Sequence, residues 1–229
     1  MDTTVATRTH TSTGWERLAG AGAIAFAVLV GGVNAISSTA PDWTASGEEV
    51  AKWIHDHHTT SAIETGLFAV TAPFLIVFLA GFVLRVRRHG DTRAQVPALI
   101  GALGGVMIGA TFAAVVVDRL VLLSMDGNAV DPSLTQLVWH FEVAAFMINV
   151  VSVSVALFGV AWAASRVGLA PGWYRPLSAV ALVAGVIAVA QSAGAVNGAD
   201  GWQIGFLPFL AWLLLLLIVG IRMVREPAS

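Results

Sequence analysis

The sequence predicts an all-α membrane protein: a polytopic bundle of six transmembrane helices with one short interfacial helix. Three observations lead to this prediction. First, 57% of the 229 residues are hydrophobic and only 11% are charged, whereas a soluble domain has about 25% charged residues. Second, the mean hydropathy is +0.80, which is typical of a chain solvated mainly by lipid. Third, apolar runs long enough to cross a hydrocarbon core about 30 Å thick recur along the chain.

Six apolar segments are expected to form one transmembrane domain over residues 18–223. Their approximate ranges are 18–36, 61–86, 97–123, 134–164, 177–195 and 202–223. The polar residues 1–17 are expected to form a cytoplasmic arm, and residues 224–229 a cytoplasmic tail. A cleaved signal peptide is an alternative for the first segment, because Ser38-Thr39-Ala40 offers a small-x-small cleavage site. The apolar run is, however, longer than the about 7–15 residues of a secretory signal.

Residues 37–60 differ from the spans. Ser46 and Glu49 have the spacing of a capping box, and Val50, Trp53 and Ile54 would share one face of the helix that follows. We expect a short amphipathic helix at the outer interface, with Trp53 at the level of the lipid headgroups.

Basic residues are distributed unevenly about the predicted membrane. Only Lys52 and Arg119 fall on one side, so ten of the twelve basic residues fall on the other. These ten are Arg8, Arg17, Arg85, Arg87, Arg88, Arg93, Arg166, Arg175, Arg222 and Arg225. The positive-inside rule therefore predicts cytoplasmic termini and an external segment at 40–58. Arginine greatly outnumbers lysine, as in a GC-rich bacterial genome, so a bacterial cytoplasmic membrane is the expected location.

Several kinds of chemistry are excluded by what the sequence lacks. It has no cysteine, which excludes disulfides, thiolate nucleophiles and cysteine-ligated metals. His55, His57 and His58 have no zinc-ligand spacing, so we interpret them as a solvated cluster and predict no metal site. Only His140 lies within a span, which argues against bis-histidine haem. No phosphate loop or triad spacing occurs. No catalytic residue or cofactor is assigned, and lipid rather than nucleic acid is the expected partner.

Two local patterns predict how the helices begin and pack. Gly101, Gly105 and Gly109 repeat every four residues, with Gly104 alongside, and small residues at this spacing allow close helix–helix contact in lipid. Asp131-Pro132 has the pattern of an N-cap followed by proline at the first helical position.

Ionisable groups at membrane depth are costly and are therefore functional candidates. The candidates for ligand binding are Glu142, Arg119, Asp118, Glu64, His140 and Asn149. The first five are expected near the outer ends of their helices. Each has a simpler alternative as an interfacial group. Glu64 in particular follows Ser61 by three residues, which is again capping-box spacing.

Glu142 is the strongest candidate, because its helical face is small and polar. Ala145, Asn149 and Val153 share that face, with Ser152 to one side, so we expect it to point into the bundle. A lone carboxylate at this depth would be desolvated. We therefore predict that Arg119 pairs with Glu142, with Asp118 or Glu64 as a competing acid, and that Trp139 marks the outer aromatic belt.

The pattern resembles a broad group of uncharacterised bacterial six-helix integral membrane proteins. The resemblance rests on Pro41 to Trp53 before the second span, the Arg85–Arg93 loop, and the closing Ala211-Trp212-Leu213 with Arg222. That group has no assigned activity and so implies only the six-helix fold. The leading hypothesis is that a small ligand or ion binds at an outward-facing polar pocket, for transport or sensing. The alternatives are a membrane-embedded, possibly metal-dependent enzyme using Glu142, Asp118 and histidines, and an accessory or structural subunit.

Overall fold

The structure is a computed structural model that describes residues 12–36, 40–126, 131–191 and 205–226. Within these ranges the chain forms seven helices and no strand. They are α1 (Ser12–Ile36), α2 (Gly47–Asp56), α3 (His58–His89), α4 (Thr92–Met125), α5 (Pro132–Arg166), α6 (Tyr174–Ala190) and α8 (Phe206–Arg225). The all-α class predicted from the sequence is therefore confirmed.

Five helices are long and apolar enough to cross a membrane. They are α3, α4, α5 and α8 over their full lengths, and α1 from Gly14 to Ile36. The helix α6 has 17 residues, fewer than the about 20 that a bilayer crossing needs. The predicted fifth span, 177–195, and the sixth, 202–223, both extend into residues 192–204, which lie outside the described ranges. The count of six spans is therefore not confirmed.

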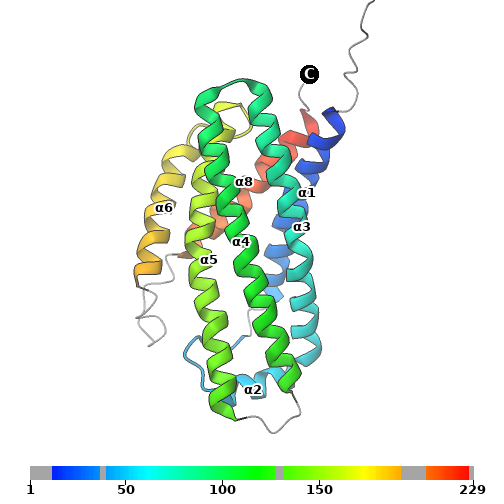
Figure 1. The fold of residues 1–229 in the computed structure, drawn as a ribbon, viewed down its shortest axis with the longest axis vertical. Helices are drawn as coiled ribbons and strands as arrows, with labels where there is room; N and C mark the ends of the chain where they lie inside the picture. The colour runs from blue at the N-terminus through cyan, green and yellow to red at the C-terminus, as the bar shows by residue number, and fades with distance from the viewer. Residues whose placement is uncertain (1–11, 37–39, 127–130, 192–204, 227–229) are drawn as a thin grey trace, which may run out of the picture.

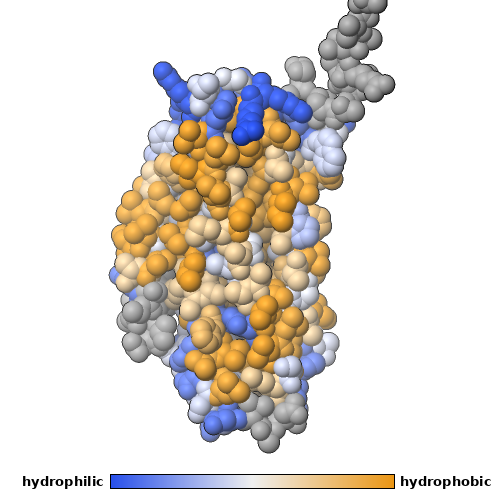
Figure 2. Space-filling model, in the orientation of Figure 1, coloured by the Kyte–Doolittle hydropathy of each residue, from blue (hydrophilic) through white to orange (hydrophobic). Residues whose placement is uncertain are grey.

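The long helices run alternately up and down in one bundle (Figure 1). The helix α4 packs along α5 and α3, while α1 packs between α3 and α8, and α6 lies against the outer side of α5. The helix α2 lies across one end of the bundle, which we call the α2 end. Hydrophobic side chains cover most of the middle of the visible face, and hydrophilic ones gather at its two ends (Figure 2).

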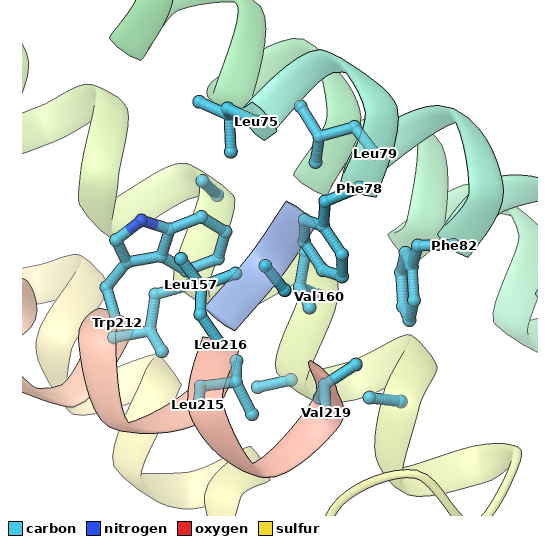
Figure 3. Close-up of a cluster of buried hydrophobic side chains, with 14 of the residues drawn as sticks. Leu75, Phe78, Leu79, Phe82, Leu157, Val160, Trp212, Leu215, Leu216 and Val219 are labelled. Atoms are coloured by element: carbon cyan, nitrogen blue, oxygen red, sulfur yellow. The ribbon is translucent and has the colours of Figure 1, made fainter. Parts of the chain in front are cut away.

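The larger of two clusters of buried hydrophobic residues lies mostly in the half of the bundle away from α2, and the smaller one lies at the α2 end. In the larger cluster, Phe78 and Phe82 of α3, Leu157 of α5 and Trp212 and Leu216 of α8 are almost fully buried and point toward one another (Figure 3). The helix α1 contributes Phe26 and Val30, among others, to the same cluster. The cleavage site proposed for a signal peptide falls partly on residues 37–39, outside the described ranges.

Glycines bring α4 close to its neighbours, as predicted. A Cβ on Gly101 or Gly104 would lie 2.7 or 2.5 Å from the backbone nitrogen of Val160 or Ala156 in α5. A Cβ on Gly105 would collide with the side chain of Leu79 in α3, whereas one on Gly109 would meet nothing within 4 Å. The close-contact prediction therefore holds for Gly101, Gly104 and Gly105 and is wrong for Gly109, whose Cβ position faces open space although its neighbours Ile108 and Phe112 are buried.

The end opposite α2 carries many of the basic residues and is held together by ion pairs. Glu16 of α1 accepts hydrogen bonds from Arg85 (2.6 Å) and Arg88 (3.1 Å) of α3. Asp91 accepts a hydrogen bond of 2.8 Å from Arg166 of α5. This hydrogen bond, together with the positive charge of Arg166, holds the pKa of Asp91 below its ordinary value. These contacts join α1 and α5 to the end of α3 and to the α3–α4 turn.

Helix starts agree with the sequence at two places and differ at a third. Ser46 and Glu49 form the predicted capping box of α2, and the hydrogen bonds that Ser46 donates lower the pKa of Glu49. Asp131 caps α5 with Pro132 at its start. The capping-box interpretation of Ser61 and Glu64 is wrong, because α3 begins at His58 and the Ser61 amide already bonds to the His57 carbonyl.

Candidate functional site

The helix α2 closes one end of the bundle and positions the candidate site beneath it. Its apolar face, with Val50 and Ile54, packs on Leu122 of α4 and Val143 of α5. Gly47 lies so close to the Pro132 carbonyl that a Cβ there would collide with it. The apolar face of α2 therefore packs on α4 and α5 and does not face lipid.

Arg119 of α4 and Glu142 of α5 form the buried ion pair predicted from the sequence. Arg119 Nε donates a hydrogen bond of 3.0 Å to Glu142 Oε2, and Arg119 Nη2 donates to Glu142 Oε1. Both carboxylate oxygens are thus engaged by one guanidinium, in the forked geometry that arginine forms with carboxylates. Arg119 is 8% and Glu142 1% exposed, so water does little to weaken the pair.

Glu64 of α3 is the second acid of this cluster. Its Oε2 lies 3.8 Å from Arg119 Nη1, which is an ion-pair distance but longer than a hydrogen bond. Glu64 is also buried, at 3% exposed. The three side chains come from three different helices, so the cluster exists only when α3, α4 and α5 are packed together.

Two tryptophans cover the guanidinium. The centre of the Arg119 guanidinium lies 5.2 Å from the Trp53 ring and 5.8 Å from the Trp139 ring, both within the range of cation–π attraction. The Trp139 indole nitrogen also donates a hydrogen bond of 3.2 Å to the Asp42 carbonyl. Trp53 was predicted to lie at the level of the headgroups and Trp139 in an outer aromatic belt, but neither side chain faces outward, since both are buried in the protein. Both rings are buried because they pack on this charge.

A cavity of about 270 Å³ lies beside the ion pair. Its polar wall consists of Arg119, Glu142, Asn149 and Asn34, and the rest is mostly apolar. Aromatic residues form much of the lining: Trp43, Phe68, Phe112, Trp139, Phe146, Phe206 and Phe209. The remaining lining residues are Ala40, Pro41, Val143, Val150, Val153 and Gly205. A second, much smaller cavity also borders Arg119, and its other lining residues are Glu64, Thr65, Phe68, Val115 and Val116.

The face of α5 that carries Glu142 points into the bundle, as predicted. Asn149 lies two turns further along this face and is 6% exposed. Its Oδ1 accepts a hydrogen bond of 2.9 Å from the Thr111 hydroxyl of α4. Ala145 and Ser152 are buried as well. The polar wall thus continues from Arg119 along the α4–α5 contact.

The structure brings some of the six candidates together and leaves others apart. Glu142, Arg119 and Asn149 line the larger cavity, and Glu64 reaches the same guanidinium from the smaller one. Asp118 and His140 line neither cavity. His140 points elsewhere because it lies about 200° around the helix from Glu142.

The histidines at the α2–α3 junction contact other residues at this end. His55 Nδ1 lies 2.9 Å from Asp126 Oδ1, and His58 Nε2 lies 4.0 Å from Asp126 Oδ2. The His57 ring stacks on Trp53. In the described part of the chain, no group of three or more His, Asp or Glu side chains is placed to hold a metal ion.

Sequence reasoning missed the aromatic and amide residues that close the cavity. Trp43 lies in the short segment before α2, and Phe206 and Phe209 begin α8. Asn34, near the end of α1, also lines the cavity and was not among the candidates. An aromatic residue in an apolar chain gives no local signal that separates a cavity wall from a lipid-facing position.

No protein-family model, no curated protein and no solved structure matches this chain. The resemblance to a six-helix group therefore adds nothing to the site, whose interpretation rests on its geometry.

Proposed function

We propose that this protein binds a small, largely apolar molecule in the cavity beside the Arg119–Glu142 pair, as the binding step of transport or sensing. The cavity itself carries this proposal. It is mostly apolar, with a few convergent polar groups on one wall, and ligand sites in proteins commonly have this character. Its volume is slightly below the about 300–1,000 Å³ of typical ligand pockets, so the ligand is small.

The burial of the polar groups favours a site over a simple membrane boundary. Arg119 and Glu142 are withdrawn from solvent at the joint between α4 and α5. A buried ion pair is a poor source of stability, because desolvation offsets much of the attraction between the charges. The position of this ion pair beside a cavity is therefore better explained by a role in binding a ligand there than by a contribution to stability alone.

The expected orientation supports access from outside the cell. The basic residues at the opposite end favour a cytoplasmic location for that end, which leaves α2 and the cavity on the external side. The enzymatic alternative lacks a comparable observation. Its proposed acid Asp118 and the histidines do not line the cavity, while both Glu142 oxygens already accept hydrogen bonds from Arg119.

The test is thermal unfolding of the protein in lipid nanodiscs with three small phenyl probes. The probes are benzyltrimethylammonium, its neutral carbon isostere neopentylbenzene, and the anion 3-phenylpropionate, at matched free aqueous concentrations. At least one probe should stabilise the protein, by about 2.7 kcal/mol when its concentration is 100 times its Kd.

Two matched variants distinguish binding of a probe in the cavity from partitioning of the probe into the lipid. Val150 lines the cavity, so Val150→Phe should abolish the stabilisation by filling the space. Ile148, two residues away and 50% exposed, is the control, and Ile148→Phe should respond like the unmodified protein. Stabilisation by none of the probes, or equal stabilisation of both variants, would overturn the proposed function.

A further inference from the structure

We infer that the ligand is an organic cation: an ammonium group or protonated amine on an apolar, aromatic-sized body. This inference rests on the proposed function and specifies its ligand class. It follows from the charge balance at the cavity, the character of the lining, and the way in which Arg119 is already engaged.

The buried charges beside the cavity do not balance. Glu64 and Glu142 supply two carboxylates, and Arg119 supplies one guanidinium. All three are at most 8% exposed. Lys52, a basic residue of α2 at the same end, is exposed and is not part of this cluster. Asp118, half-buried on the same turn as Arg119, adds negative rather than positive charge. A ligand that carried one positive charge would complete the balance.

The lining suits a cation with an apolar body. Aromatic faces attract cations, and quaternary ammonium ligands are commonly held by aromatic side chains. Trp43, Phe112 and Phe146 line the cavity that Glu142 borders. A cavity of about 150 Å³ holds a benzene molecule, so 270 Å³ leaves room for a phenyl-sized body together with a trimethylammonium group.

Arg119 is badly placed to bind an anion instead. Its Nε and one terminal nitrogen already donate to Glu142, and its guanidinium lies over the rings of Trp53 and Trp139. An anionic ligand would have to displace Glu142 and leave that carboxylate buried without its partner, which is costly. A carboxylate also has about four acceptor positions, of which Arg119 uses two, so Glu142 retains capacity for an N–H donor on a protonated amine.

The three phenyl probes test this inference directly, because the cation and its carbon isostere share one shape and differ only in charge. We expect the Kd of benzyltrimethylammonium to be at least ten times lower than that of neopentylbenzene or 3-phenylpropionate. Neopentylbenzene binding as tightly as the cation would overturn the inference and leave the proposed function standing, since a proton on one carboxylate would then balance the charge. Tighter binding of 3-phenylpropionate would overturn it as well.

A variant that removes one negative charge provides a second test of the same inference. Glu64 lies outside the larger cavity, so Glu64→Gln removes the excess negative charge without reshaping that cavity. The preference for the cation over its isostere should fall at least tenfold in this variant, while the affinity for neopentylbenzene stays the same. An unchanged preference would show that the excess charge does not select the ligand. The comparison in the unmodified protein remains decisive if this variant does not fold.

Discussion

Arg119 connects the buried acidic and aromatic side chains at the α2 end. It is the one basic side chain of this end that the described structure buries, and it contacts Glu142, Glu64 and the rings of Trp53 and Trp139. An arginine at this depth is expensive unless its charge is paired. Its five N–H donors and planar face allow it to serve both carboxylates and both aromatic rings, which a lysine could not do.

The Arg119–Glu142 pair should show strong coupling in a double-mutant cycle. Removing either partner leaves an uncompensated buried charge, so Arg119→Gln and Glu142→Gln should each cost about 3–5 kcal/mol. The double variant should cost less than the sum of the two, because it leaves neither charge alone. Thermal unfolding in detergent measures all three. Strict additivity would mean that the two groups do not interact in the membrane-embedded protein.

The Asp91–Arg166 pair at the opposite end predicts a dependence of stability on pH. The pKa of Asp91 is lowered, first by the hydrogen bond from Arg166. A carboxyl with a depressed pKa stabilises the folded state above its ordinary pKa, here 3.8, and loses that contribution as the pH falls through the folded-state value. Asp91→Asn should therefore lower the unfolding temperature at pH 7. The difference should begin to shrink as the pH falls to about 3.8 and should vanish only below the lower folded-state pKa of Asp91.

Asparagine is the matched replacement for Asp91, since it also caps helices well. The comparison therefore isolates the charge from the cap at the start of α4. A difference between the two proteins that stays constant from pH 7 to the acid limit would contradict an ionic contribution from Asp91.

At the scale of elements, α2 shows which features nearby residues predict and which depend on the tertiary structure. Its existence, bounds and capping box follow from Ser46, Glu49 and the spacing of Val50, Trp53 and Ile54, because these signals lie within a few residues. What covers the apolar face of α2 cannot be predicted from these local signals. Periodicity says that a face is apolar but not whether lipid or protein covers it, and here α4 and α5 cover it.

The glycines of α4 provide a graded test of helix packing. Gly104→Ala should destabilise the protein by about 1–3 kcal/mol, because the new methyl group would press on the α5 backbone at Ala156. Gly105→Ala should cost less, since the flexible side chain of Leu79 can move aside. Gly109→Ala, the matched control in open space, should be neutral or slightly stabilising, because alanine favours helix more than glycine does.

Unfolding of purified variants in one detergent ranks the three substitutions. Equal effects at Gly104 and Gly109 would place α4 away from α5 and would contradict the packing described for the α4–α5 contact.

At the scale of the whole molecule, the sequence predicts the helical class and the inward face of α5, because hydropathy and helical period report them directly. The Arg119–Glu142 pair was predictable for a further reason: few other charges lie at that depth. The cavity was not predictable. Its lining joins Asn34, Trp43, Phe112, Glu142 and Phe206, residues far apart in sequence whose convergence depends on how the helices cross.

The orientation in the membrane is the next prediction at this scale. The chain has no cysteine, so single cysteines can be labelled cleanly. Glu48→Cys, exposed on α2, should react with an impermeant maleimide in intact cells. His89→Cys, exposed beside the α3–α4 turn, should react only after the membrane is opened. The reverse pattern would place the cavity on the cytoplasmic side.

The most direct test of the central claim, that the cavity is a ligand site, is a crystal structure grown in a lipidic mesophase with benzyltrimethylammonium. We expect density for the probe inside the cavity, with its ammonium group toward Glu142 and its ring among Trp43 and Phe112. The Arg119–Glu142 pair should remain intact. A cavity closed by neighbouring side chains, or a probe bound only elsewhere, would contradict the account.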